Sequence, residues 1–179
     1  RNQEGIAPVL PVLEEIENVT DKAQWSEVLG KAMDFGLWAM YVDADAMNSS
    51  MNILNEYQAG FALSQKDYYV DEDEHTQHIR AEYLKHVEKM FTLFGQANAA
   101  EKAATVLRLE TRLAKAAFSN VELRDPIANY NKMSIAELQA LVPQVDWQVY
   151  FAGLNIAPDS LSVGQIRHLQ EAGKMLQEE

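Results

Sequence analysis

The sequence has 179 residues, with 27 acidic against 15 basic side chains and a formal net charge of -12. This negative potential disfavours nucleic acid as a partner, and neither a basic amphipathic stretch nor a long apolar run indicates a membrane contact. The absence of cysteine excludes disulfides, thiol catalysis and thiolate metal sites. Because the first residue is Arg1 rather than Met, we expect an N-terminus produced by cleavage or truncation.

The first third of the chain predicts two short helices and then a β-hairpin. Residues 8–19 carry apolar side chains at helical spacing, and Asp21 can cap a second helix that reaches about Phe35. In 37–60 the pattern changes to strand formers on both sides of a polar turn cluster at 48–50. This segment is therefore predicted to form a hairpin.

A long helical pair is predicted over 71–119. Gly95 divides this stretch, and the short connection favours an antiparallel arrangement of the two helices. The acids at 71–74 fall in the first turn of the first helix, where the helix dipole favours negative charge. Its apolar face consists of Ile79, Tyr83, Val87, Met90, Phe91 and Phe94.

The last third predicts short helices with recognisable caps. Ser134 and Glu137 have the spacing of a capping box, and Asp146 can cap a helix that starts at the next residue. A final helix is expected over 163–177. The fold class is therefore mainly α, a bundle-like helical lobe with one small β-hairpin in a single region over 1–179.

Two histidines on the acidic helix start are the strongest candidates for a metal site. His75 and His78 are three residues apart, so a helix presents both imidazoles on one face, as a divalent ion requires. Since the sequence fixes no third strong ligand nearby, a solvated acidic helix start explains them better, with adventitious metal binding at most. The sequence also lacks a His-Glu-x-x-His zinc helix, a Gly-x-Ser-x-Gly elbow and a Walker loop. We therefore assign no catalytic, cofactor or metal residue.

Glu110 is a carboxylate in the middle of an apolar helical stripe. Its neighbours three and four residues away are apolar, so we expect it to be buried, ionised and held by a cation or by several donors. Arg124 follows the helix and is the first candidate for a structural ion pair with Glu110. A catalytic acid is the alternative, but nothing else catalytic converges on this position.

The order of several segments resembles the N-terminal region of the neprilysin-like zinc metallopeptidases. In the run YVDADAMNSSMNILNEYQAGFALSQKDYY, the matching features are Asp45, an Asn-Ser turn at 48–50, a Gly-Leu-x-Leu-like stretch at 60–63 and a final Asp-Tyr-Tyr at 67–69. The chain departs from the family in having Ser-Gln-Lys at 64–66, where Pro-x-Arg is common. Downstream matches are Phe94-Gly95, Glu110 with Leu113-Ala114, the run ELRDPIANYNKM, and Asp146-Trp147 with Tyr150-Phe151.

This resemblance implies a piece of a larger zinc metalloendopeptidase or oligopeptidase that lies outside the cytoplasm, in a periplasmic, cell-surface or secreted location. It implies that the catalytic lobe of the same polypeptide is the partner, that peptides are the substrates, and that the zinc ligands lie beyond residue 179. The isolated chain is then expected to be inactive and to expose some apolar surface. The alternative is a stand-alone helical module that binds a protein or peptide.

Overall fold

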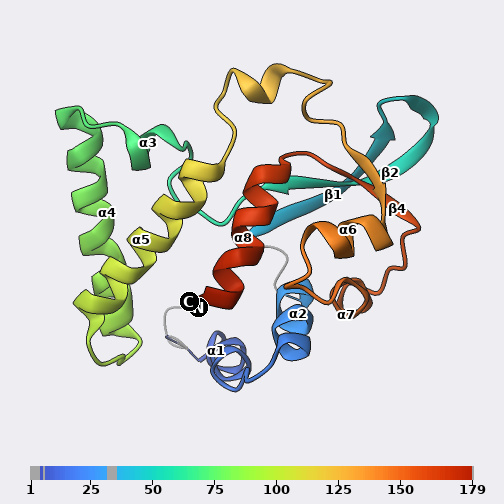
Figure 1. Ribbon diagram of the computed structural model, residues 1–179. Coiled ribbons are helices and arrows are strands. Elements are labelled where there is room, and N and C mark those ends of the chain that lie inside the picture. Colours follow the sequence, from blue (N-terminus) through green and yellow to red (C-terminus); the bar gives the residue numbers. More distant parts are fainter. Residues whose placement is uncertain (1–4, 6, 32–35, 179) are drawn as a thin grey trace. The chain divides into compact units, whose positions relative to one another are not determined.

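The computed structural model shows a mainly helical chain with one small mixed sheet (Figure 1). None of the helices in the described part is long and apolar enough to cross a bilayer. The predicted end of the second helix, at 32–35, lies outside the residues that the structure describes, which are 5, 7–31 and 36–178.

The chain divides into two compact units that are interleaved in sequence. Unit 1 combines Arg1–Ala59 with Asp125–Glu179, and unit 2 is the intervening stretch Gly60–Arg124. Unit 1 contains the sheet and is therefore built from two stretches of chain that are distant in sequence.

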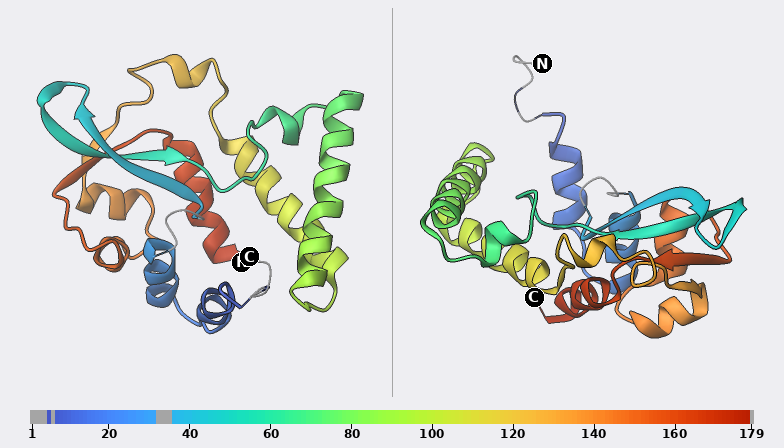
Figure 2. Two further views of the ribbon diagram at one scale, coloured as in Figure 1. Left: turned by 180° about the vertical axis from the view of Figure 1, so that it is seen from behind. Right: turned by 90° about the horizontal axis from the view of Figure 1, so that it is seen from above.

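The sheet of unit 1 has four strands in the order β1-β2-β4-β3. Strands β1 and β2 form the antiparallel hairpin, whose tip extends beyond the helices in every view (Figure 2). Strand β4 pairs parallel to β2 and antiparallel to β3. The strands are β1 (Trp38–Asp45), β2 (Asn48–Gln58), β3 (Lys132–Ser134) and β4 (Ser160–Val163). The helices of unit 1 are α1 (Leu10–Glu17), α2 (Lys22–Lys31), α6 (Ile135–Leu141), α7 (Trp147–Gly153) and α8 (Ile166–Glu178).

The hairpin is therefore part of a larger sheet than the sequence predicted. Three of the four residues of β4 are buried, so the strand lacks the alternation of apolar and polar side chains that marks a half-exposed strand. The last helix, predicted to begin at residue 163, begins instead at Ile166, and residue 163 is the last of β4. The hairpin turn also lies earlier than predicted, at residues 46–47, because the carboxylate of Asp45 accepts a hydrogen bond from the backbone of Met47 at 2.9 Å.

The predicted helix caps of the last third are confirmed. Ser134 accepts a hydrogen bond from the amide of Glu137 at 3.3 Å, and the Glu137 carboxylate accepts from the amide of Ser134 at 2.8 Å. Asp146 accepts from the amide of Val149 at 3.1 Å at the start of α7. Each cap satisfies backbone donors that the first helical turn leaves without partners.

An aromatic cluster forms the core between the hairpin and α7. The rings of Trp38 and Trp147 are 5.3 Å apart, and the Trp38 indole donates a hydrogen bond to the hydroxyl of Tyr150 at 3.1 Å. Phe151 packs on Trp147 at 5.9 Å. Both tryptophans are almost completely buried, so this cluster fixes the start of β1 against α7.

Unit 2 consists mainly of two long helices that run side by side in all views. Gly95 ends the first of them with a φ of +69°, a conformation that glycine adopts without strain. The predicted pair over 71–119 is therefore present, but its first helix starts three residues later than predicted. The helices of unit 2 are α3 (Asp67–Val70), α4 (Glu74–Leu93) and α5 (Ala99–Ala116), followed by a 3-10 turn over Glu122–Arg124.

Gly30 allows α2 to approach α7 closely, and this contact gives a test of the fold. A Cβ atom on Gly30 would overlap the carbonyl oxygen of Tyr150. Alanine in place of glycine inside a helix normally stabilises a protein by about 0.5–1 kcal/mol. We expect Gly30→Ala to destabilise the chain instead, by about 1–3 kcal/mol, because the two backbones must separate. Urea unfolding followed by circular dichroism measures the sign, and a stabilised variant would contradict the close approach.

Candidate functional site

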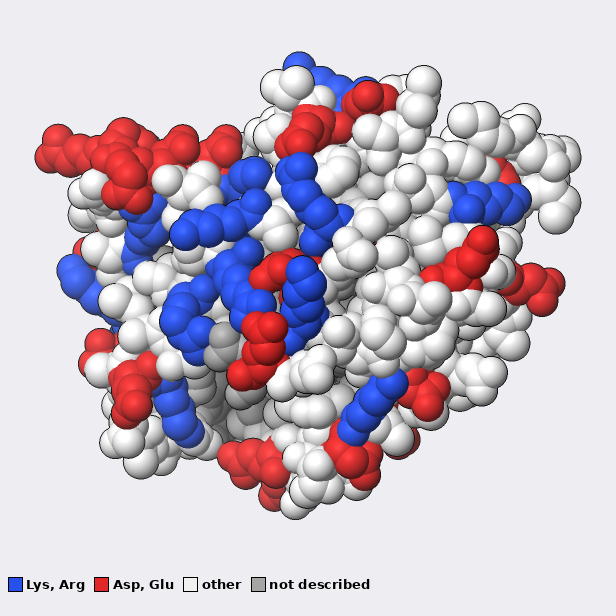
Figure 3. All heavy atoms as spheres, viewed as in Figure 1, with Lys and Arg blue, Asp and Glu red and all other residues white. Residues whose placement is uncertain are grey.

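The acidic segment before α4 is a helix cap. Figure 3 shows Asp and Glu side chains gathered at the start of α4. Asp73 is the N-cap residue, and its carboxylate accepts hydrogen bonds from the amides of His75 at 3.0 Å and Thr76 at 3.1 Å. The Thr76 hydroxyl also donates to this carboxylate. The hydroxyl, followed by the two amides, lowers the pKa of Asp73. Of the acids predicted to lie in the first turn, only Glu74 is helical.

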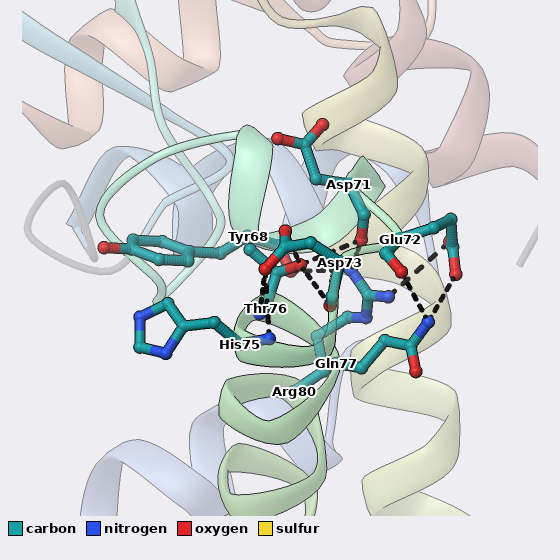
Figure 4. Close-up of polar contacts among 8 residues, drawn as sticks. All are labelled: Tyr68, Asp71, Glu72, Asp73, His75, Thr76, Gln77 and Arg80. Carbon is teal, nitrogen blue, oxygen red and sulfur yellow. Dashed lines mark hydrogen bonds and ion pairs between the residues drawn. The ribbon is translucent and has the colours of Figure 1, made fainter.

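Arg80 joins this cap to α3. Its guanidinium donates to the carbonyl oxygens of Tyr68 at 3.0 Å and Asp71 at 2.6 Å, and it lies 3.5 Å from the carboxylate of Glu72 (Figure 4). The cluster therefore has a structural role, which is to hold the connection between α3 and α4 in one conformation.

The two histidines proposed as weak metal candidates are both exposed. His75 contributes only its backbone amide to the cap, and its imidazole points away from the acid and arginine network in Figure 4. His78 lies one turn further along α4. Across residues 7–31 and 36–178, no three His, Asp or Glu side chains lie close enough together to hold a metal ion.

Glu110 is the centre of a hydrogen-bond network inside unit 2. One carboxylate oxygen accepts from the hydroxyl of Tyr69 at 2.9 Å and the other from the hydroxyl of Tyr83 at 2.9 Å. The Tyr69 hydroxyl in turn accepts from the amide of Leu63 at 2.8 Å, and Glu110 also accepts from the amide of Ala62. The network thus connects α3, α4 and α5 to the chain that precedes α3.

Two opposing effects act on the pKa of Glu110. The side chain is half-buried, and this burial raises its pKa, while the hydrogen bonds from Tyr83, Tyr69 and Ala62 oppose the rise. Burial also raises the pKa of Tyr69 and of Tyr83, so both phenols keep their protons and act as donors. Glu110 is therefore a structural acceptor with several donors.

Arg124 is not among the partners that the structure gives Glu110. It lies in the 3-10 turn after α5, whereas the two tyrosines that bind the carboxylate come from α3 and α4. Only closeness in sequence favours Arg124 as the partner. A usable signal was present in Tyr83, which lies on the predicted apolar face of α4 and, like any buried phenol, needs a partner for its hydroxyl.

The Glu110 network predicts the ranking of three variants. Tyr83→Phe leaves one half-buried carboxylate oxygen without its donor and should destabilise the chain by about 1–3 kcal/mol. Arg124→Gln should change the stability by less than about 0.5 kcal/mol, as should the control Tyr41→Phe, at a residue that is 48% exposed. Denaturant unfolding tests this ranking. If Arg124→Gln were the more damaging change, the ion pair predicted from sequence would be correct.

In unit 1, Asp45 joins the hairpin to β3 and to the loop before it. Its carboxylate accepts from the hydroxyl of Tyr130 at 2.7 Å and from the ammonium of Lys132 at 2.7 Å. Lys132, Tyr130 and the amide of Met47, in that order, lower the pKa of Asp45 to about 2. Two segments that carry the family resemblance, around Asp45 and at 122–133, are thus brought together.

Asp45 should contribute to the acid stability of the chain. Because its folded pKa is depressed, its contribution is complete above the ordinary pKa of 3.8 and is lost as the pH falls through about 2. Asp45→Asn should therefore flatten the dependence of the unfolding midpoint on pH between those two values. Thermal unfolding across this range measures the effect, and Asp159→Asn, at an exposed position, is the matched control. Equal pH dependence in both variants would contradict the assigned role.

Comparison with known proteins gives one family. A sequence model of Peptidase family M13, for the N-terminal part of its members, matches residues 1–179. The sequence is 29% identical over 160 residues to mouse endothelin-converting enzyme-like 1, and 32% identical over 113 residues to guinea pig endothelin-converting enzyme 1. These matches cover 80% and 62% of this chain.

Solved structures give the same result. The chain is similar to the crystal structure of the Mycobacterium tuberculosis zinc metalloprotease Zmp1 in complex with an inhibitor, with 28% sequence identity and a TM-score of 0.88 over 98% of this chain. The chain spans only a part of these proteins, namely 28% of the Zmp1 chain, 21% of the mouse enzyme and 15% of the guinea pig enzyme.

Proposed function

Because this chain belongs to peptidase family M13, we propose that it forms part of the helical lobe of a zinc-dependent metalloendopeptidase or oligopeptidase. In this proposal residues 1–179 are a single region of that lobe, and the lobe encloses the cavity in which peptides are cleaved. The observation that carries the proposal is the family match over the full length of the chain.

We place the zinc and the catalytic groups outside this chain. The sequence has no His-Glu-x-x-His pattern, and no third ligand lies near its two neighbouring histidines among the described residues, so the residues present do not fit a catalytic zinc site. The networks around Glu110 and Asp45 support this placement of catalysis outside the chain. In both networks, residues of the segments that resemble the family join parts of the fold and so have a structural role.

An apolar groove in unit 1 supports a partner in the rest of the polypeptide. It has a volume of about 500 Å³ and is formed mainly by α1 and α2. Val9, which caps α1, and Val12 and Ile16 on this helix are 42%, 45% and 39% exposed, so apolar side chains of the groove face water. The catalytic lobe of the same polypeptide is the partner we propose, and peptides are its substrates. An extracytoplasmic location belongs to the same proposal.

The proposal predicts where activity resides. The 179-residue chain alone should neither cleave peptides nor bind zinc stoichiometrically, because a catalytic site needs three strong ligands and a water. The product of the longer reading frame should cleave a short fluorogenic peptide and lose this activity with a chelator. Calorimetry with zinc and a peptidase assay on both proteins make the comparison.

The downstream reading frame separates the proposal from the alternative of a stand-alone binding module. A His-Glu-x-x-His helix encoded further along supports the peptidase, and a stop codon directly after Glu179 supports the module. One tight zinc in the isolated chain would contradict the assignment of the metal site to another part of the protein.

A further inference from the structure

Glu56 is a buried acid that neither the hairpin nor the proposed function explains. It lies on β2 opposite Met40 and is only 1% exposed. Among the described residues its Oε1 atom has no hydrogen-bond partner, and the donors near the carboxyl group are two backbone amides, those of Gly164 and of Gln165, the latter 3.5 Å from Oε2. A carboxylate in such surroundings is costly unless a cation compensates its charge.

Gln165, directly before α8, connects Glu56 to the rest of unit 1. Its side-chain carbonyl accepts from the amide of Gln58 at 2.7 Å, and its side-chain amide donates to Asn129 at 2.6 Å. The neighbouring Gly164 donates its amide to the carbonyl oxygen of Glu56 at 3.1 Å. A Cβ atom on Gly164 would lie 2.7 Å from that oxygen, so the two backbones are in close contact. We call Glu56, Gln58, Asn129 and Gln165 the Gln165 junction.

Within the part of the chain that the structure describes, no cation compensates the charge of this carboxyl group. The titratable group that faces it is Tyr150 on α7, a neutral phenol near neutral pH. Tyr41 on β1 is opposite Asn55 and is 48% exposed, so it lies toward the other face of the sheet. On α8, His168 is completely buried, with its Nε2 atom 2.9 Å from the carbonyl oxygen of Ala59, and Arg167 is exposed. The pKa of His168 is lowered to about 4 by burial, so it is neutral too. Strand β4 carries no titratable side chain.

We propose that Glu56 is a proton-controlled latch, which keeps the Gln165 junction closed while it is protonated and loosens it when the proton is lost. The protonated acid is neutral and can remain in the core. Loss of the proton puts a negative charge between β2 and the start of α8, where only weak backbone donors face it. The core must then let water in, and the opening that does so breaks the hydrogen bonds of Gln165.

The direction of the pH dependence follows from burial. Burial raises the pKa of Glu56 from 4.5 to about 8, against the opposing hydrogen bonds from Gln165 and Gly164. The closed junction therefore binds one more proton than the open one between these two values. The stability of the closed junction falls as the pH rises from 4.5 to about 8. Above that value Glu56 is ionised in both forms, so its titration causes no further change in stability. The latch thus opens on the alkaline side of neutrality.

Two measurements on the 179-residue chain test the latch. Carbon-13 NMR of the Glu56 carboxyl group reports its protonation directly. Hydrogen exchange of the Gln58 amide reports the junction, because this amide donates to Gln165. The exchange is compared with that of Glu56→Gln at each pH, which removes the intrinsic effect of pH on exchange. Glu88→Gln, at an exposed position on α4, is the control for loss of an acid elsewhere.

We expect a carboxyl midpoint near pH 8. The protection of the Gln58 amide, relative to Glu56→Gln, should fall by more than about tenfold between pH 6 and pH 9, since each pKa unit is worth a factor of ten. A midpoint between pH 4 and 5 overturns the proposal. A midpoint near 8 with constant relative protection also overturns it, because Glu56 would then titrate without opening the junction. If Glu56→Gln does not fold, the carboxyl midpoint of Glu56 in the wild-type chain and in Glu88→Gln, together with the exchange of the Gln58 amide corrected for its intrinsic pH dependence, gives the same decision. None of these outcomes depends on the proposed peptidase function.

Discussion

The parallel pairing of β2 with β4 is the constraint on which unit 1 depends. It brings Leu54 opposite Leu161, and beside it Gln58 bonds to Gln165 across 107 residues of chain. Without this pairing the hairpin would have only its own two strands, which rarely suffice for stability in water. Strand β4 is itself largely buried, with Leu161, Ser162 and Val163 shielded from water. Closing so long a loop costs entropy, which the buried contacts of Trp38, Trp147 and Tyr150 must offset.

Polar side chains inside this small core act as connectors. Asp45 holds the hairpin corner to the cation of Lys132 on β3 and to the phenol of Tyr130 in the loop before it. Glu110 does the equivalent in unit 2 with two phenols and a backbone amide. Each has all the donors it needs, in agreement with the rule that buried carboxylates are stable only with partners. Glu56 differs because its partners are few and weak, so the proton supplies what the neighbouring side chains do not.

The elements that could be predicted from sequence are those fixed by local chemistry. Ser134 and Asp146 cap helices that start at the residue after each cap. In α4 and α5 the helical spacing of apolar residues extends over many residues, so both helices can be recognised without knowledge of distant contacts. What could not be predicted depends on contacts across the chain. Strand β4 carries no alternation because both its faces are covered. In β2 the buried residues include the polar Glu56 and Gln58, so no simple alternation of apolar and polar side chains marks its inward face. The donors of Glu110 lie 27 and 41 residues away in sequence, beyond the reach of any spacing rule.

The contacts of the Gln165 side chain determine how unit 1 can tolerate the segment inserted into it. It binds Gln58, just before the chain leaves unit 1, and Asn129, just after the chain returns. The exit and the re-entry are therefore held side by side by unit 1 itself. Because unit 1 itself fixes the points at which the chain leaves and returns, it can accept intervening segments of different length. A longer insertion adds only a slowly growing entropy cost of loop closure. Residues 60–124 thus occupy a natural grafting point, at which evolution or an engineer could exchange one helical hairpin for another without redesigning the sheet.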